Sequence, residues 1–109
     1  MSGDAAIIIR DNREASRFEA TLGRDVAIVD YNLVDGGIVI SHTEVPKAFQ
    51  GQGIAGKLYE AALASARKEG RRVIPVCPVF AAYLQRHPET HDIIDPSFRR
   101  SLGLPPATS

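Results

Sequence analysis

The sequence has one cysteine, no apolar run long enough to cross a bilayer and no excess of charge of either sign. With Cys77 alone, an intramolecular disulfide is excluded and a reducing compartment is expected. A membrane helix would need about 20 apolar residues, and the run Ile7–Ile9 is too short for a secretory signal. Thirteen basic and thirteen acidic residues cancel, so no net field draws the chain to nucleic acid or to an anionic membrane. We therefore expect a cytoplasmic protein with neither as a partner.

Metal chemistry is also not expected, because the histidines lack the spacing and the sulfur partners of a metal site. These histidines are His42, His87 and His91. The chain of 109 residues, 44% of them hydrophobic and 24% charged, fits one globular domain with a single core. We expect one domain over residues 1–109, with residues 103–109 as a flexible tail.

Alternating apolar residues and turn signals predict an antiparallel meander at the start of the chain. The expected strands are Ala5–Arg10, Ser16–Leu22, Val26–Leu33 and Ile38–Val45. Asp35-Gly36-Gly37 supplies the positive φ angles of a tight hairpin, and Pro46 ends the last strand by removing a backbone donor.

The hydrophobic period then changes from that of a strand to that of a helix. Apolar residues from Ile54 to Ala66 recur at helical spacing, and Gly70 follows as a C-cap. The β-branched run Val73–Cys77 predicts a buried strand, which the helical crossover makes parallel to its predecessor. A short helix over Val79–His87 is expected to end at Pro88. The predicted fold class is mixed α/β: an antiparallel meander followed by a β-α-β unit.

The segment FQGQGIAGKL, residues 49–58, suggests a phosphate-binding loop. Its G-x-G-x-x-G spacing resembles the dinucleotide fingerprint, but that motif directly follows a strand and needs an acidic residue about 20 positions later. Here PKAFQ intervenes and no acidic residue stands at that distance. A Walker loop is disfavoured because Leu58 follows Gly56-Lys57. A glycine turn that merely begins a helix remains a third interpretation.

The absence of a capping side chain favours a ligand over this third interpretation. A helix start normally recruits Ser, Thr, Asp or Asn to accept from its unpaired amides, and this loop has none. Glycines at 51 and 53 let the backbone approach an external anion, whose charge the helix dipole favours.

The segment EVPKAFQGQGIAGKLYEAAL resembles the acyl-CoA loop of the GNAT N-acetyltransferases, with Gln50, Gly53 and Ala55 as its Q-x-x-G-x-A motif. Downstream, CPVFAAYLQRHPE resembles a small single-domain branch of that superfamily with Cys-Pro and His-Pro-Glu motifs. The two segments and the strand before them cover residues 38–89, about half of the chain. The resemblance implies acetyl-CoA as the cofactor and an amine as the acceptor. The implied cofactor contacts are Val45, Gln50, Gly51, Gln52, Gly53, Ile54, Ala55, Gly56 and Lys57.

Larger members of the superfamily insert two helices between their first and second strands, whereas only DNREAS separates the first two strands here. A minimal GNAT-like fold with a shallow, open acceptor side is therefore expected. Pro75 cannot donate a ladder hydrogen bond. We accordingly expect the two parallel strands to part near this proline and leave a wedge for the pantetheine and the thioester.

Five residues are candidates for the chemistry. Alternation along the strand predicts Ile38, Ile40, His42 and Glu44 on one face. Transfer to an amine needs a base and an acid. Glu44 or His42 is the candidate base, and the resemblance implies Tyr83 as the acid. Each of these three also has a purely structural interpretation.

Cys77 and His87 belong to the small-branch pattern. Cys77 is either a buried hydrophobic residue or a nucleophile, and His87 either assists it or ends a helix. We expect an N-acetyltransferase that works by direct transfer, with a non-catalytic CoA or acyl-CoA sensor as the alternative. The acceptor, a small amine or a protein lysine or N-terminus, is left open.

Overall fold

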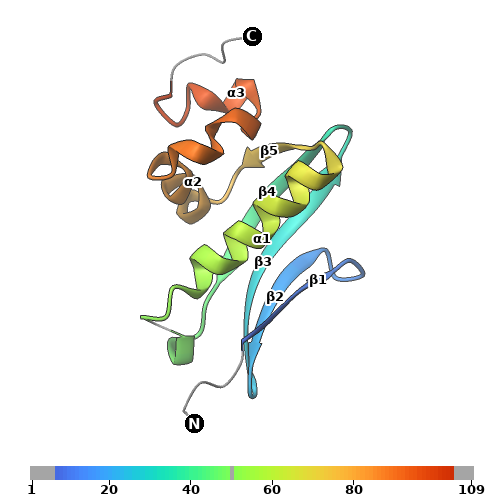
Figure 1. Cartoon of the computed structure of the whole chain (residues 1–109), viewed down its shortest axis with the longest axis vertical. Coiled ribbons are helices and arrows are strands. Elements are labelled where there is room, and N and C mark those ends of the chain that lie inside the picture. The colour runs from blue at the N-terminus through green and yellow to red at the C-terminus, as the bar shows by residue number, and fades with distance from the viewer. Residues whose placement is uncertain (1–6, 50, 105–109) are drawn as a thin grey trace.

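The computed structural model describes residues 7–49 and 51–104, which form a five-stranded mixed sheet with a long helix across one face (Figure 1). In chain order the elements are β1 (Ile8–Asn12), β2 (Arg17–Leu22), β3 (Asp25–Val34), β4 (Gly37–Glu44), the 3-10 helix η1 (Lys47–Phe49), α1 (Ile54–Glu69), β5 (Arg72–Pro75), α2 (Pro78–Gln85), the 3-10 helix η2 (Pro88–Ile93) and α3 (Pro96–Arg99). Within the described ranges, no helix is long and apolar enough to cross a membrane.

The strands lie in the sheet in the order β1-β2-β3-β4-β5. The first four pair antiparallel and β5 pairs parallel to β4, which confirms the predicted mixed α/β class. The expected strand Ala5–Arg10 begins instead at Ile8 and runs to Asn12, and Ala5 and Ala6 lie outside the described residues. Only residues 13–16 join β1 to β2, so the described chain has no helix at that position.

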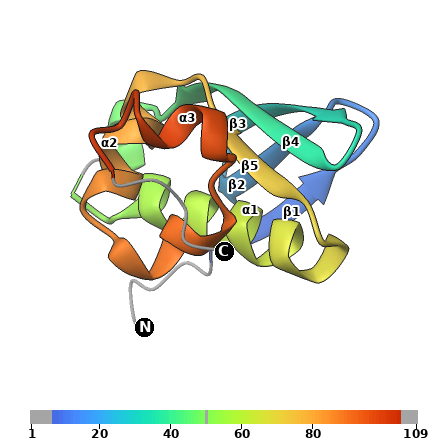
Figure 2. The same ribbon diagram turned by 90° about the horizontal axis from the view of Figure 1, so that it is seen from above.

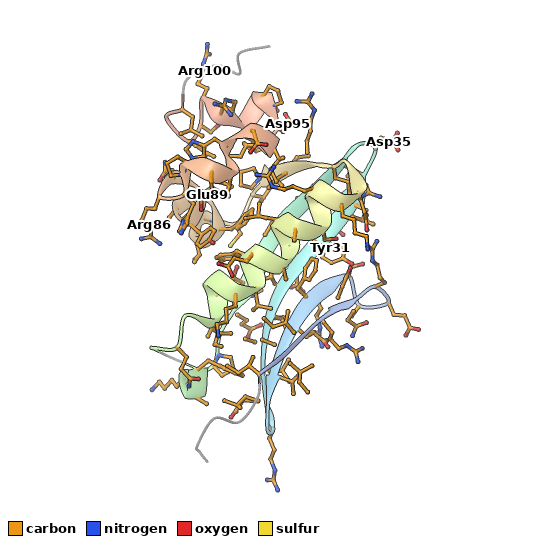
Figure 3. The ribbon with its side chains drawn as sticks, in the orientation of Figure 1. Tyr31, Asp35, Arg86, Glu89, Asp95 and Arg100 are labelled. Carbon is orange, nitrogen blue, oxygen red and sulfur yellow. The ribbon has the colours of Figure 1, made fainter. Side chains whose placement is uncertain are left out.

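Helix α1 covers the inner face of the sheet, which we define as the face in contact with this helix (Figure 1). Its apolar stripe includes Leu58 and Ala62, both fully buried against the buried side chains of β2 and β3. Tyr31 of β3 lies between the helix and the sheet (Figure 3), where its hydroxyl donates to Asp11 Oδ1 at 2.6 Å. The opposite, outer face carries no helix of the described residues, as the view along the long axis shows (Figure 2).

A β-bulge interrupts the pairing of β3 with β4. Tyr31 pairs with Ile40, but the preceding Asp30 pairs with His42, so Ser41 is an extra residue with no residue opposite it in the register. Its hydroxyl donates to the carbonyl of Asp30 at 3.3 Å. Such an extra residue reverses the in-and-out alternation of the strand beyond it. Beyond Ser41, each side chain of β4 therefore lies on the opposite face from the one that simple alternation predicts.

The C-terminal elements pack beside β5 at one end of the sheet (Figures 1 and 2). The expected helix Val79–His87 is α2, which begins at Pro78 and ends at Gln85. Beyond it, Ile94 forms a bridge with Val73 of β5. The first two residues of the tail expected over 103–109 are held in place: Gly103 donates to the carbonyl of Arg100, and Leu104 donates to the carbonyl of Arg99 and packs on the core. Residues 105–109 lie outside the described part.

Candidate functional site

The two parallel strands part at Pro75, as the sequence predicts. Their pairing ends at Ile40 opposite Pro75, while β4 continues as far as Glu44. The carbonyl of Ile40 accepts from the amides of both Val76, at 3.1 Å, and Cys77, at 2.9 Å. This double acceptance turns the chain out of the sheet and into α2, so the expected strand Val73–Cys77 is shorter, Arg72–Pro75. The end of β4 consequently has no β5 residues beside it.

The glycine loop presents the start of α1 next to this parting. Gly51 and Gly53 adopt φ angles of 81° and 67°, a region that other residues enter only with strain. Gly53 is the N-cap and no side chain caps the helix, whose first turn has no acidic residue. The first amides of a helix have no intrahelical acceptor. The loop therefore offers N–H donors and a positive helix end, which suit a diphosphate.

The other side chains of the expected cofactor loop differ in exposure and in their contacts. Gln52 is folded onto the loop itself, because its side-chain amide donates to the carbonyl of Ala48 at 3.0 Å. Lys57 is exposed, and Ile54 is buried in the core. The expected contact from Gln50 lies outside the described residues.

A buried polar cluster, which the sequence patterns did not indicate, joins β4 to both helices. Thr43 Oγ1 lies 2.7 Å from the hydroxyl of Tyr59 on α1 and 3.4 Å from Sγ of Cys77 at the start of α2. Tyr59 and Cys77 are both buried, and burial raises the pKa of Tyr59. Thr43 reaches this cluster because the bulge turns it inward, and no local sequence pattern identifies a bulge.

Aromatic rings extend from this cluster along α2. The ring of Tyr83 lies 5.0 Å from that of Tyr59 and stacks at 3.9 Å on the ring of His87. Burial, followed by the nearby charges of Glu60 and Glu89, raises the pKa of Tyr83, so the phenol keeps its proton at neutral pH. His87 Nδ1 lies 2.7 Å from the carbonyl of Tyr83. This contact fits the helix-ending interpretation of His87.

Because of the bulge, His42 and Glu44 lie on a different face of the sheet from the one that the sequence predicts. Glu44 pairs across the sheet with Ile28, and Thr43 pairs with the buried Val29. His42 and Glu44 therefore point to the outer face, away from the Thr43 cluster, with exposed fractions of 57% and 69%. Their side chains are neighbours, with Nε2 and Oε2 at 3.6 Å. The prediction of one shared face was wrong for the set Ile38, Ile40, His42 and Glu44.

Glu44 instead lines a pocket of about 470 Å³ on the outer face, which we call the outer pocket. The residues that line it are Arg17, Val26, Ile28, Glu44, Val45 and Pro46. The pocket lies at the end of β4, the part of the strand that β5 does not accompany. A carboxylate among apolar walls can hold a cationic group and accept its proton.

Comparisons with known proteins identify the family of the chain. The family model described as GCN5-related N-acetyltransferase matches residues 17–93. Protein NATD1 of Xenopus tropicalis is 31% identical over 91 residues, which cover 81% of this chain and 84% of that protein. Protein NATD1 of Mus musculus is 33% identical over 85 residues, 75% of this chain and 77% of that protein.

A solved structure supports the same assignment. The solution structure of a GCN5-like candidate N-acetyltransferase from Staphylococcus aureus superposes with a TM-score of 0.64 at 25% identity. The match covers 86% of this chain and 91% of the other. The chain belongs to the GCN5-related N-acetyltransferase family.

Proposed function

We propose that this protein transfers the acetyl group of acetyl-CoA to a primary amine. One observation carries the proposal: β4 and β5 separate at Ile40 and Pro75 beside a helix that begins on uncapped glycines. A parted pair of strands provides room for an extended chain, and the uncapped helix start provides donors for its diphosphate. Membership of the acetyltransferase family supports both assignments.

The residues of the loop fit the proposed cofactor. The amides of Gly51 and of Gly53 to Gly56 would hold the diphosphate, whereas the amide of Gln52 already donates to the carbonyl of Phe49 at 3.2 Å. Val45, which directly follows β4, would flank the pantetheine arm. Lys57, exposed on the first turn of α1, adds a positive charge for a phosphate group. When bound, acetyl-CoA supplies an acetyl group activated as a thioester.

The proposed chemistry assigns a base to the outer face and an acid to α2. Glu44 takes one proton from the ammonium of the acceptor, and His42 at 3.6 Å is its charged neighbour when protonated. A C–N bond would form between the neutral amine and the acetyl carbon, the C–S bond would break, and Tyr83 would give its proton to the departing sulfur. The second proton, which the nitrogen must lose to become an amide, would pass to the Tyr83 oxygen and restore the phenol. His87, stacked on Tyr83, acts as a positioning residue.

Calorimetric titration of the chain with CoA, NAD and ATP tests the cofactor, and an amine panel with acetyl-CoA tests turnover. We expect CoA to bind with a preference over the other two nucleotides, and an acetylated amine to appear by mass spectrometry. CoA binding without transfer to a small amine, a polyamine or a lysine peptide would favour the sensor alternative. Absence of CoA binding would overturn the proposal altogether.

Replacing Cys77 by alanine should leave most of the transfer rate, because we propose direct attack without an acetyl-cysteine intermediate. Its thiol is buried and lies 3.4 Å from Thr43 Oγ1, a contact consistent with a packing role. Initial rates of Cys77→Ala and intact-mass spectra of wild type during turnover provide the measurement. A variant that is folded but inactive, together with an acetylated wild-type chain, would establish the covalent route.

A further inference from the structure

The outer pocket has mainly apolar walls and carries one acidic and one basic side chain, Glu44 and Arg17. Val26, Ile28, Val45 and Pro46 make it apolar, and Glu44 is its acidic group. Val26 and Ile28 lie on β3, and Ile28 is the cross-strand neighbour of Glu44. Val26 is 39% exposed, so the pocket presents apolar surface that no described part of the chain covers.

Arg17, the basic residue of the outer pocket, is ion-paired with Glu19, a carboxylate that Arg10 also approaches at 3.4 Å. The Nε of Arg17 lies 2.7 Å from Glu19 Oε2, and hydrogen bonds from Arg17 and Asn12 hold the pKa of Glu19 below its usual value. Glu44, by contrast, has His42 as its one ionic neighbour in the described ranges. An entering ligand therefore meets the negative charge of Glu44.

We infer that the outer pocket binds a primary alkylammonium group, and that Val26 and Ile28 select acceptors with an unbranched apolar stem. The inference rests on the proposed function and names its acceptor class. Glu44 holds the ammonium end, while the stem lies along the two β3 side chains and removes their apolar surface from water. An acceptor with a polar or charged stem would bury those groups without partners. An ammonium group on an unbranched apolar stem is present both in free alkylamines and in the side chain of lysine.

Ligand binding can be mapped without turnover. Titration of the CoA-saturated protein with n-pentylamine should give saturable NMR shifts at Val26, Ile28 and Val45. 3-Methoxypropylamine, which has the same length but an oxygen in its stem, should bind about fourfold or more weakly, the cost of roughly one methylene of apolar burial. Equal binding of the two amines, or shifts confined to other residues, would overturn the inference even if amines are acetylated.

A matched pair of variants tests Val26 as the specificity-determining residue. Val26→Lys places a cation in the outer pocket and removes apolar wall, so KM for n-pentylamine should rise about tenfold or more, the loss of two or more buried methylenes. Val34→Lys makes the same change at the other end of β3, at a side chain of similar exposure, 44%. We expect its KM to stay at the wild-type value. Equal KM values for the two variants would overturn the assignment.

Two further measurements are needed. One distinguishes a free alkylamine from a protein lysine as the acceptor, and the other distinguishes failure of the proposed acceptor class from failure of the proposed function. A pentapeptide with one lysine and n-pentylamine are compared by kcat/KM, and a higher value for the peptide assigns the pocket to protein lysines. A higher value for n-pentylamine assigns it to free alkylamines. CoA affinity is measured in parallel for each variant. Unchanged CoA binding with no effect of Val26→Lys refutes the acceptor class alone, whereas absent CoA binding refutes the proposed function itself.

Discussion

Replacing Glu44 by glutamine is expected to lower kcat/KM for the amine about 10²- to 10⁴-fold, the range that a positioned general base contributes. Glutamine keeps the shape of the side chain but cannot take a proton from the ammonium. The side chain is 69% exposed, so the fold should be unaffected. Steady-state kinetics with acetyl-CoA and n-pentylamine, together with the CoA dissociation constant, provide the measurement.

His42→Gln is the matched control for this result, because His42 shares the outer face with Glu44 at 3.6 Å. We expect a loss for His42→Gln much smaller than that for Glu44→Gln. If His42→Gln is the more damaging change, the base is His42. If neither variant loses activity, the proton is removed by a group away from the end of β4.

The second large effect is expected at the glycine loop. Gly53→Ala should weaken CoA binding at least about tenfold, because the N-cap would leave its left-handed geometry or strain to keep it, at about 1–2 kcal/mol. Gly53 has a φ of 67°, and a methyl group added at its Cα would meet nothing within 4 Å. The penalty therefore comes from backbone conformation. Calorimetric titration with CoA measures the affinity, and chemical denaturation measures the free energy of unfolding.

Gly70→Ala provides the control at the other end of the same helix. Gly70 caps the C-terminus of α1 with a φ of 68°, so alanine there costs a similar amount of backbone strain. Both variants should unfold more easily than wild type, but only Gly53→Ala should lose CoA affinity. Equal loss in both would mean that general destabilisation, and not presentation of the loop amides, controls binding.

Much of this fold could be predicted because its signals are local. The spacing of apolar residues in α1, the glycines of the loop and the proline of β5 each act within a few residues of the chain. The separation of β4 and β5 was also predictable, since Pro75 has no amide proton to donate to any neighbour. The structure agrees on each of these points.

The faces on which His42 and Glu44 lie could not be predicted from alternation. Asp30 pairs with His42 and Tyr31 pairs with Ile40. This register depends on both strands together, so the sequence of either strand alone does not predict it. The extra Ser41 turns Thr43 toward the buried Tyr59. Both Thr43 and Tyr59 were missed, because a threonine in a strand and a tyrosine on an apolar helix face are ordinary.

By itself, the sequence determined that a mixed sheet forms and that an uncapped glycine turn begins its long helix, because these features depend on backbone chemistry within short segments. Only the tertiary structure decided that Glu44 lines the outer pocket with Val26 and Ile28. The reason is that side-chain direction at the end of β4 depends on its register with β3. A single unpaired residue in that register moves the acidic group from one face of the sheet to the other.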